Sequence, residues 1–189
     1  MVRAILATTL STVYGIYSSF ELCENRAVKP NSEEYLDSEK YQVRHWDWDR
    51  PGHIKELVRA VNEIRRAHPA LHWNGSLRFC ETDNPQIIAY MKTASDGTDP
   101  VLVIVNLDPH YMQHGHVEVP VALFGLAADE AYTARDLLTD TPFTWVGGRN
   151  YVRLDPGVRQ AHVISLSSET RVLRIAPKEV EESESATGH

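Results

Sequence analysis

The chain has 189 residues, of which 42% are hydrophobic and 24% are charged. This composition supports one good core or two small ones and excludes disorder of the chain as a whole. The formal net charge of -7 argues against nucleic-acid binding as the main task, because proteins that bind a phosphate backbone normally present a basic face. Cys23 and Cys80 form no framework of paired spacings, which predicts two buried free thiols and a reducing, cytoplasmic compartment.

The first part of the chain predicts a helix, a strand, a long loop and a second helix. Apolar residues at helical spacing indicate a helix from Val2 to Ser11, which is too short to span a membrane. The aromatic and aliphatic run Gly15–Phe20 is typical of a buried strand. From Pro51, a typical first-turn residue, an amphipathic pattern predicts a helix that ends before His68, which should pack near the domain junction.

A long loop that follows a strand and precedes a helix is the arrangement at the C-terminal face of a (β/α)8 barrel, where active sites lie. One and a half such units cannot close a barrel. We therefore expect residues 1–74 to be the C-terminal end of a catalytic barrel and the chain to begin inside a larger protein.

Short alternating runs follow the turn signal Asn74–Gly75. They predict roughly seven or eight strands, at Leu77–Glu81, Ile87–Thr93, Val101–Asn106, Gly115–Val119, Tyr132–Asp136, Tyr151–Leu154 and Ala161–Leu166. This spacing describes an antiparallel β-sandwich over residues 75–170, followed by an acidic, disordered tail at residues 171–189. The predicted fold class is α/β plus all-β, a terminal βα unit of a (β/α)8 barrel followed by the sandwich. Gly147–Gly148 is expected to be a turn and not a phosphate loop, since no helix follows it.

The segment from Tyr14 to Trp48, which we call the aromatic loop, interleaves Tyr, Trp, Glu, Asp and Lys. Such a mixture suits a sugar site, because rings cover the apolar C–H faces of a sugar and charged side chains orient its hydroxyls. Lys40 and Tyr41 are the best candidates for substrate contact, an ammonium donor beside a ring. Alternatively, Lys40 pairs with a neighbouring carboxylate and Tyr41 packs on the helix.

The other polar and aromatic residues of the aromatic loop are expected to have structural roles. Loop shaping is predicted for Tyr17, Glu21, Glu24 and Tyr35, and anchoring to the following helix for Trp46 and Trp48. A zinc site at His110, His114 and His116 is disfavoured, because these residues lie in a predicted hairpin whose alternate side chains point to opposite faces.

The order of residues in the aromatic loop is more specific than its composition. Ile16–Glu21 resembles the end of the last barrel strand in the alpha-amylase superfamily, glycoside hydrolase family 13. The continuation ELCEN, EEYLDSEKYQ and a Trp-Asp pair is similar to the bacterial maltosyltransferases of that family that use a maltosyl phosphate donor, and the likeness covers roughly the chain up to Leu166. Ser19 departs from the pattern, which has Gly at this position. A side chain here narrows the turn that leads to Glu21.

The resemblance implies an enzyme that moves maltosyl from α-maltose 1-phosphate to the non-reducing end of an α-1,4-glucan of the glycogen type, releasing phosphate with retention of configuration. It implies a homodimer without metal or organic cofactor, in which Lys40 and Tyr41 hold the non-reducing end of the donor disaccharide. In the superfamily the nucleophile and the acid/base lie on earlier barrel strands. No catalytic residue is therefore assigned to this chain, which is expected to be inactive alone.

Three other hypotheses are weighed against this one. Two carboxylates of the aromatic loop could form their own catalytic pair, from Glu21, Glu24, Glu33, Glu34, Asp37 and Glu39. The chain could come from another glycosidase or transglycosidase of the superfamily, but the EEYLDSEKYQ stretch argues against that. A stand-alone glucan-binding sandwich would need coplanar exposed rings, whereas its candidates Tyr90, Tyr111, Trp145 and Tyr151 are scattered along the sequence.

Overall fold

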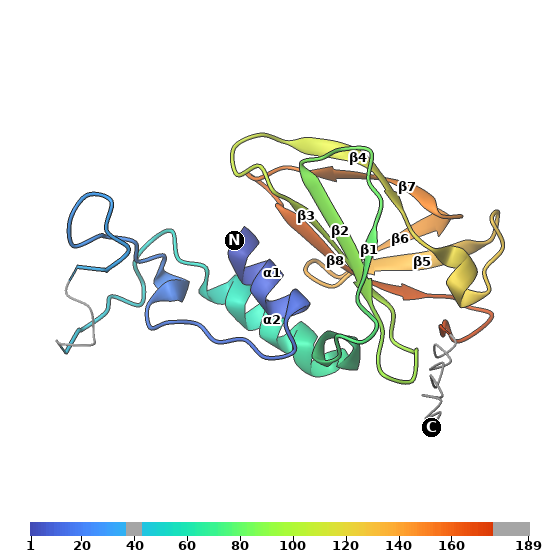
Figure 1. Cartoon of the computed structure of the whole chain (residues 1–189), viewed down its shortest axis with the longest axis horizontal. Coiled ribbons are helices and arrows are strands. Elements are labelled where there is room, and N and C mark those ends of the chain that lie inside the picture. Colours follow the sequence, from blue (N-terminus) through green and yellow to red (C-terminus); the bar gives the residue numbers. More distant parts are fainter. Residues whose placement is uncertain (37–42, 176–189) are drawn as a thin grey trace, which may run out of the picture.

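The computed structural model describes residues 1–36 and 43–175 (Figure 1). The helical elements are α1 (Val2–Leu10) and α2 (Lys55–Ala67), with short 3-10 helices η1 (Phe20–Leu22), η2 (Pro69–His72) and η3 (Val121–Phe124). The strands are β1 (Arg78–Cys80), β2 (Ile87–Lys92), β3 (Val101–Asn106), β4 (Gln113–Glu118), β5 (Ala131–Asp136), β6 (Thr141–Val146), β7 (Arg149–Leu154) and β8 (Ala161–Ser167). Both α-helices thus precede all the strands in this part of the chain.

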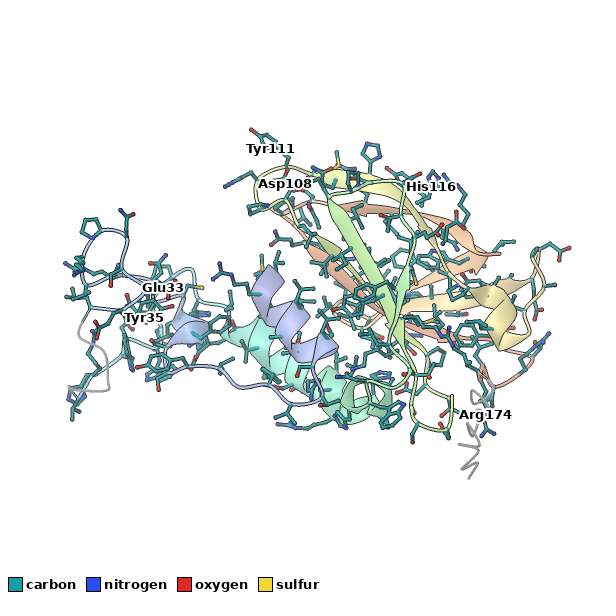
Figure 2. All side chains as sticks on the ribbon, viewed as in Figure 1. Glu33, Tyr35, Asp108, Tyr111, His116 and Arg174 are labelled. Atoms are coloured by element: carbon teal, nitrogen blue, oxygen red, sulfur yellow. The ribbon has the colours of Figure 1, made fainter. Side chains whose placement is uncertain are left out.

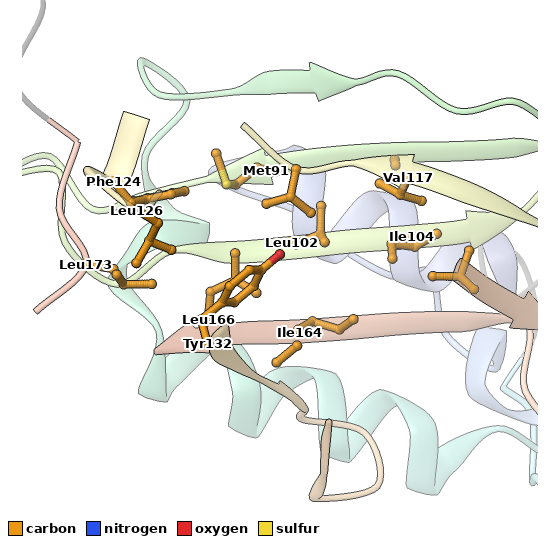
Figure 3. Close-up of a cluster of buried hydrophobic side chains, with 14 of the residues drawn as sticks. Met91, Leu102, Ile104, Val117, Phe124, Leu126, Tyr132, Ile164, Leu166 and Leu173 are labelled. Carbon is orange, nitrogen blue, oxygen red and sulfur yellow. The ribbon is translucent and has the colours of Figure 1, made fainter. Parts of the chain in front are cut away.

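The strands form two antiparallel sheets. One has six strands in the order β1-β2-β3-β8-β5-β6, and the other consists of β4 and β7. The two sheets face each other and share a core, which Figure 3 shows from the side. The predicted antiparallel β structure of the C-terminal part is confirmed, and the two facing sheets are consistent with a β-sandwich.

The core between the sheets is built from alternate residues of the strands. Leu102 and Ile104 of β3 meet Val117 of β4 and Leu154 of β7, and all four side chains are fully buried (Figure 3). Burying such a side chain stabilises the fold by roughly 1.5–3 kcal/mol. The β4–β7 pair is therefore held to the larger sheet mainly by apolar packing.

The two α-helices cover the other face of the six-stranded sheet (Figure 1). Val101, Val103 and Val105 of β3 pack there against Ile5 of α1 and Val61 of α2. Successive side chains of a strand point to opposite faces, so β3 is buried on both sides. Burial on both faces explains why the sequence of β3 is apolar without alternation.

Buried polar groups also join the helices to each other and to the sheet. The hydroxyls of Thr9 on α1 and Tyr90 on β2 lie 2.6 Å apart. Arg65 of α2 donates to the carbonyls of Ser11 and Thr12 at 3.0 and 2.8 Å, and is itself only 9% exposed. These bonds satisfy carbonyls at the C-terminal end of α1, which lacks intrahelical partners for them.

The predicted helix at Val2–Ser11 and the helix end before His68 are confirmed, but two N-terminal predictions are wrong. Gly15–Phe20 is not a strand: the segment turns into η1, with Ile16 and Tyr17 exposed by 43% and 53%. A strand needs a neighbour that completes its hydrogen bonds, and within residues 1–36 and 43–175 no strand pairs with this segment. The second helix begins at Lys55, because the chain still turns at Gly52, whose φ is 81°.

Each of the seven predicted strands occurs, with ends that differ by two residues at most, and Val101–Asn106 matches β3 at both ends. The prediction missed β6, which pairs with β5 at the margin of the larger sheet. Its sequence contains Pro142, which cannot donate to a ladder and is tolerated at an edge. As expected, Gly147–Gly148 is a turn, and it leads from β6 in one sheet to β7 in the other.

Candidate functional site

The aromatic loop begins with two backbone turns around η1. Ser19 has φ of 70° and Cys23 has φ of 57°, the left-handed region that favours glycine. Ser19 is the position at which the sequence pattern predicted Gly, so a serine here adopts the backbone shape of the glycine it replaces. Cys23 is exposed, and its predicted burial is wrong, whereas Cys80 is half-buried and burial raises the pKa of its thiol to about 11.

Contacts with α2 fix the first part of the loop. The N–H of Ile54, just before α2, donates to the carbonyl of Glu21 at 2.7 Å. The Tyr14 hydroxyl donates to the side-chain oxygen of Asn62, and the Arg65 guanidinium lies 5.3 Å from the Tyr14 ring centre. The loop is therefore carried by the same helix that packs on the sheet.

Beyond η1 the chain forms a small hairpin. The N–H of Val28 donates to the Glu34 carbonyl at 2.9 Å, and the N–H of Leu36 donates to the Arg26 carbonyl at 2.8 Å. The Tyr35 ring lies 6.3 Å from the ring of Tyr17, in a tilted arrangement. Figure 2 shows Glu33 and Tyr35 on this hairpin, on the far side of the helices from the sandwich.

The predicted substrate-binding residues Lys40 and Tyr41 lie outside the described residues, which omit 37–42. The described residues on either side are linked, since Arg44 donates to the carbonyl of Leu36 at 3.1 Å. The Arg44 guanidinium also lies 4.4 Å from the ring centre of Trp46. Arg44 was not singled out from the sequence, although the spacing Arg-x-Trp was available as a signal.

The loop carboxylates have different surroundings. Glu24 accepts from the N–H of Arg26 at 3.1 Å and from Arg50 at 3.3 Å, and these partners outweigh partial burial and lower its pKa. One side-chain oxygen of Glu21 is buried without a hydrogen-bond partner among the described residues. Glu33 and Glu34 are exposed, and Asp37 and Glu39 lie outside the described residues.

The structure also places the aromatic and histidine candidates. Trp48 is linked to α2 through its carbonyl, which accepts from Lys55. His116 bonds to Asp83 through Nδ1 at 2.8 Å, on the outer side of the β4–β7 sheet (Figure 2). Within residues 1–36 and 43–175, no three His, Cys, Asp or Glu side chains are grouped to hold a metal ion. His68 ends α2, and its Nδ1 lies 2.7 Å from Asp99.

Sequence reasoning missed a polar cluster inside the sandwich. Asp136 of β5 is fully buried and accepts from Nδ1 of His162 at 2.8 Å and from Arg159 at 3.0 Å. The signal was a histidine at a core-facing position of the apolar strand β8. It was hard to use, because the three residues are separated along the chain and meet only after β5 and β8 pair.

The fold defines the class of domain first. The chain is similar in structure to a maltogenic alpha-amylase from Thermotoga neapolitana, with a TM-score of 0.58, 15% sequence identity, and coverage of 86% of this chain and 35% of that one. At this identity the likeness concerns the fold alone. No helix among the described residues has the length and apolarity needed to cross a membrane.

The sequence comparisons give the family. Residues 79–166 match the family model described as "GLGE, C-terminal". Two relatives are an alpha-1,4-glucan:maltose-1-phosphate maltosyltransferase from Methylacidiphilum infernorum, 44% identical over 88% of this chain, and one from Streptomyces coelicolor, 49% identical over 86%. The chain therefore matches the C-terminal part of these maltosyltransferases, which confirms the resemblance that the aromatic loop predicted. It spans about a quarter of the length of these relatives, covering 25% and 24% of them.

Proposed function

We propose that the chain is the C-terminal portion of a maltosyltransferase that extends α-1,4-glucans of the glycogen type. The observation that carries this proposal is the identity of 44% and 49% to two enzymes of that name over most of the chain. In this proposal residues 1–74 complete a (β/α)8 barrel, residues 75–170 are the terminal sandwich, and residues 171–189 are a tail.

In the proposed reaction the bond between C1 of the maltosyl unit and the phosphate oxygen breaks, and phosphate leaves. A new bond forms between C1 and the hydroxyl at the non-reducing end of the glucan acceptor, with overall retention. Retention requires two carboxylates, a nucleophile and an acid/base. The proposal puts both on barrel strands outside this chain, so the chain alone is inactive.

Lys40 and Tyr41 are proposed to line the donor side of the active site. Contacts between described residues fix the chain on either side of them. Arg44 donates to the carbonyl of Leu36, and the rings of Tyr17 and Tyr35 pack against each other. One buried side-chain oxygen of Glu21 has no hydrogen-bond partner among the described residues. This supports a polar site whose remaining groups lie outside the described residues. An ammonium group that bonds sugar hydroxyls would contribute to donor binding in both the ground and transition states.

The test uses the full-length protein that contains this chain, with phosphate release from α-maltose 1-phosphate measured in the presence of glycogen. Lys40→Ala is expected to raise KM for the donor by about tenfold with little change in kcat, because a hydrogen bond to a charged group contributes about 1.5–3 kcal/mol. Lys29→Ala is the matched control, since Lys29 is an exposed lysine of the same loop. An absence of phosphate release from the unmodified protein would overturn the proposed function, and equal KM values for both variants would overturn the role of Lys40.

The proposal also includes a cytoplasmic homodimer. Support for the compartment comes from Cys23 and Cys80, which are both free thiols. The dimer rests on the family resemblance, and sedimentation of the full-length protein tests it: a single species of monomer mass would contradict it.

A further inference from the structure

A cavity of about 240 Å³ opens at one side of the sandwich, between β6 and β7. These strands are edges of their two sheets, so the inter-sheet space is open here. Phe143 and Trp145 of β6 line the cavity, and Tyr151 of β7 lies at its rim, 55% exposed, with its ring 5.7 Å from the ring of His116 on the outer side of the sheet. Trp145 and Tyr151, which are separated in the sequence, thus both border this opening because β6 and β7 meet there.

The cavity has a built polar wall. His162 lines it and is only 9% exposed, and its Nδ1 lies 2.8 Å from the carboxylate of Asp136. An ionised carboxylate can only accept, so Nδ1 donates the hydrogen of this bond, and Nε2 is the ring nitrogen left to meet a ligand hydroxyl. Nε2 has no hydrogen-bond partner among the described residues, and Arg153 adds donors at the exposed rim.

The charges behind the cavity are paired within a buried cluster. Burial alone would raise the pKa of Asp136, but the hydrogen bond and charge of His162, the N–H of Leu138 and the charge of Arg159 outweigh it and lower that pKa. The carboxylate is therefore ionised at neutral pH, and it lies directly behind the histidine. Because the charges of this cluster are paired with one another, the wall offers a hydrogen-bonding ring nitrogen and not a free charge, which suits a sugar hydroxyl.

We propose that this cavity is a second carbohydrate site, which binds the end of an α-1,4-glucan chain away from the aromatic loop. The terminal sugar packs against Trp145 and Phe143 and forms a hydroxyl hydrogen bond with Nε2 of His162, while the next sugar passes over Tyr151 beside Arg153. The volume is below the roughly 300–1,000 Å³ of pockets for drug-sized ligands, which suits one enclosed sugar. The choice of ligand rests on the proposed function.

Binding is tested on the purified chain by NMR titration with maltotriose, observing the indole N–H of Trp145 and the ring protons of His162. We expect both sets of signals to shift, with a dissociation constant in the millimolar range. Tyr151→Ala should weaken binding by about fivefold, as expected for loss of one ring from an exposed sugar contact. Tyr111→Ala is the matched control, because Tyr111 is 72% exposed on the sandwich and does not line the cavity.

The proposal would be overturned if maltotriose left the Trp145 and His162 signals unmoved, or if Tyr111→Ala weakened binding as much as Tyr151→Ala. The shifts in the unmodified chain decide the matter even if a variant fails to fold. A Lys40→Ala, Tyr41→Ala double variant separates this site from the loop, since it should leave these shifts unchanged. Failure of the proposed function appears separately, as loss of donor turnover in the full-length protein while maltotriose still binds here.

Discussion

Lys92 on β2 is fully buried and has no carboxylate partner among the described residues. Its ammonium group donates to the carbonyls of Thr9 and Leu71, both at 3.2 Å, and to the side-chain oxygen of Asn74 at 2.9 Å. Burial, followed by the charge of Arg65, lowers the pKa of Lys92 from 10.5 to about 8. Lys92 therefore joins α1 and η2 to the sheet through its ammonium group, whose charge is costly to bury.

The lowered pKa of Lys92 predicts a rise in stability between pH 8 and pH 9. In this range the native state loses a proton that the unfolded state keeps, so unfolding requires proton uptake and becomes less favourable as pH rises. The titration of Lys92 should contribute an increase of about 1 kcal/mol to the free energy of unfolding over that pH unit. Urea denaturation at several pH values measures it.

The control for this prediction is a pair of variants. Lys92→Met should flatten the rise, whereas Lys29→Met, at an exposed position, should retain it. The Cys80 thiol offsets part of this rise, because burial raises its pKa from 9.0 to about 11, so that near pH 9 the unfolded state loses a proton that the native state keeps. Both variants retain Cys80, so the difference between their profiles isolates Lys92. Identical profiles for Lys92→Met and Lys29→Met would show that Lys92 titrates normally.

At this scale the sequence identifies candidate side chains but not their partners. The sugar site indicated by the run of residues around Lys40 stays a prediction, because Lys40 lies outside the described residues. By contrast, nothing local distinguishes Lys92 from a solvated lysine, and its burial depends on where α1 and η2 meet β2. Asp136 and His162 likewise gain their roles from strand pairing between residues distant in sequence.

Ser19 determines the shape of the turn that leads into η1. Its φ of 70° is unfavourable for a residue with a Cβ, by roughly 1–2 kcal/mol, and glycine removes that strain but has more entropy to lose on folding. We expect Ser19→Gly to stabilise the chain by about 0.5–1 kcal/mol. The midpoint of urea denaturation measures the change.

The comparison for Ser19 is its neighbour Ser18, which is exposed and does not have a positive φ. Ser18→Gly relieves no backbone strain, because Ser18 is not in the left-handed region, and it should destabilise the chain by about 0.4–1 kcal/mol. If both variants shifted the midpoint in the same direction, the turn at Ser19 would not be strained.

Strand prediction succeeded where the sequence pattern reports burial. Val101–Asn106 was located correctly because burial on both faces gives an uninterrupted apolar run. Thr141–Val146 was missed because an edge strand has mostly exposed or half-exposed residues and contains Pro142. Gly15–Phe20 was wrongly predicted to be a strand for the converse reason. Its apolar and aromatic residues are intrinsically suited to a strand, but they lack a pairing partner among the described residues.

The whole chain leaves apolar surface uncovered on the side away from the sandwich. Within the aromatic loop, Val43, Tyr17 and Ile16 are exposed by 90%, 53% and 43%. A further apolar cavity of about 160 Å³ opens between α1, α2 and this loop. Surface of this kind is normally covered by another part of a protein, so we expect the isolated chain to self-associate.

Analytical ultracentrifugation over a range of concentrations measures this association. Ile16→Asp should shift the chain towards monomer, because it places a charge at the uncovered surface. Val172→Asp is the control, since Val172 is 79% exposed but lies after β8. A monodisperse monomer of the unmodified chain at every concentration would contradict the prediction.

The antiparallel strands of the C-terminal part followed from turn spacing and periodicity, but the placement of the helices on the sheet did not. The sequence predicted α2 as amphipathic without indicating that Val61 would pack against β3. Contacts between such distant segments depend on three-dimensional complementarity, which a pattern of apolar residues leaves open.

The double burial of β3 limits how the chain can be divided. Removing the segment before Asn74 would uncover Val101, Val103 and Val105 along the middle of the larger sheet, together with Tyr90. A sandwich grafted onto another enzyme would therefore have to bring α1 and α2 with it, or find a substitute cover there. In protein engineering, the transplantable module is the sandwich with its helices.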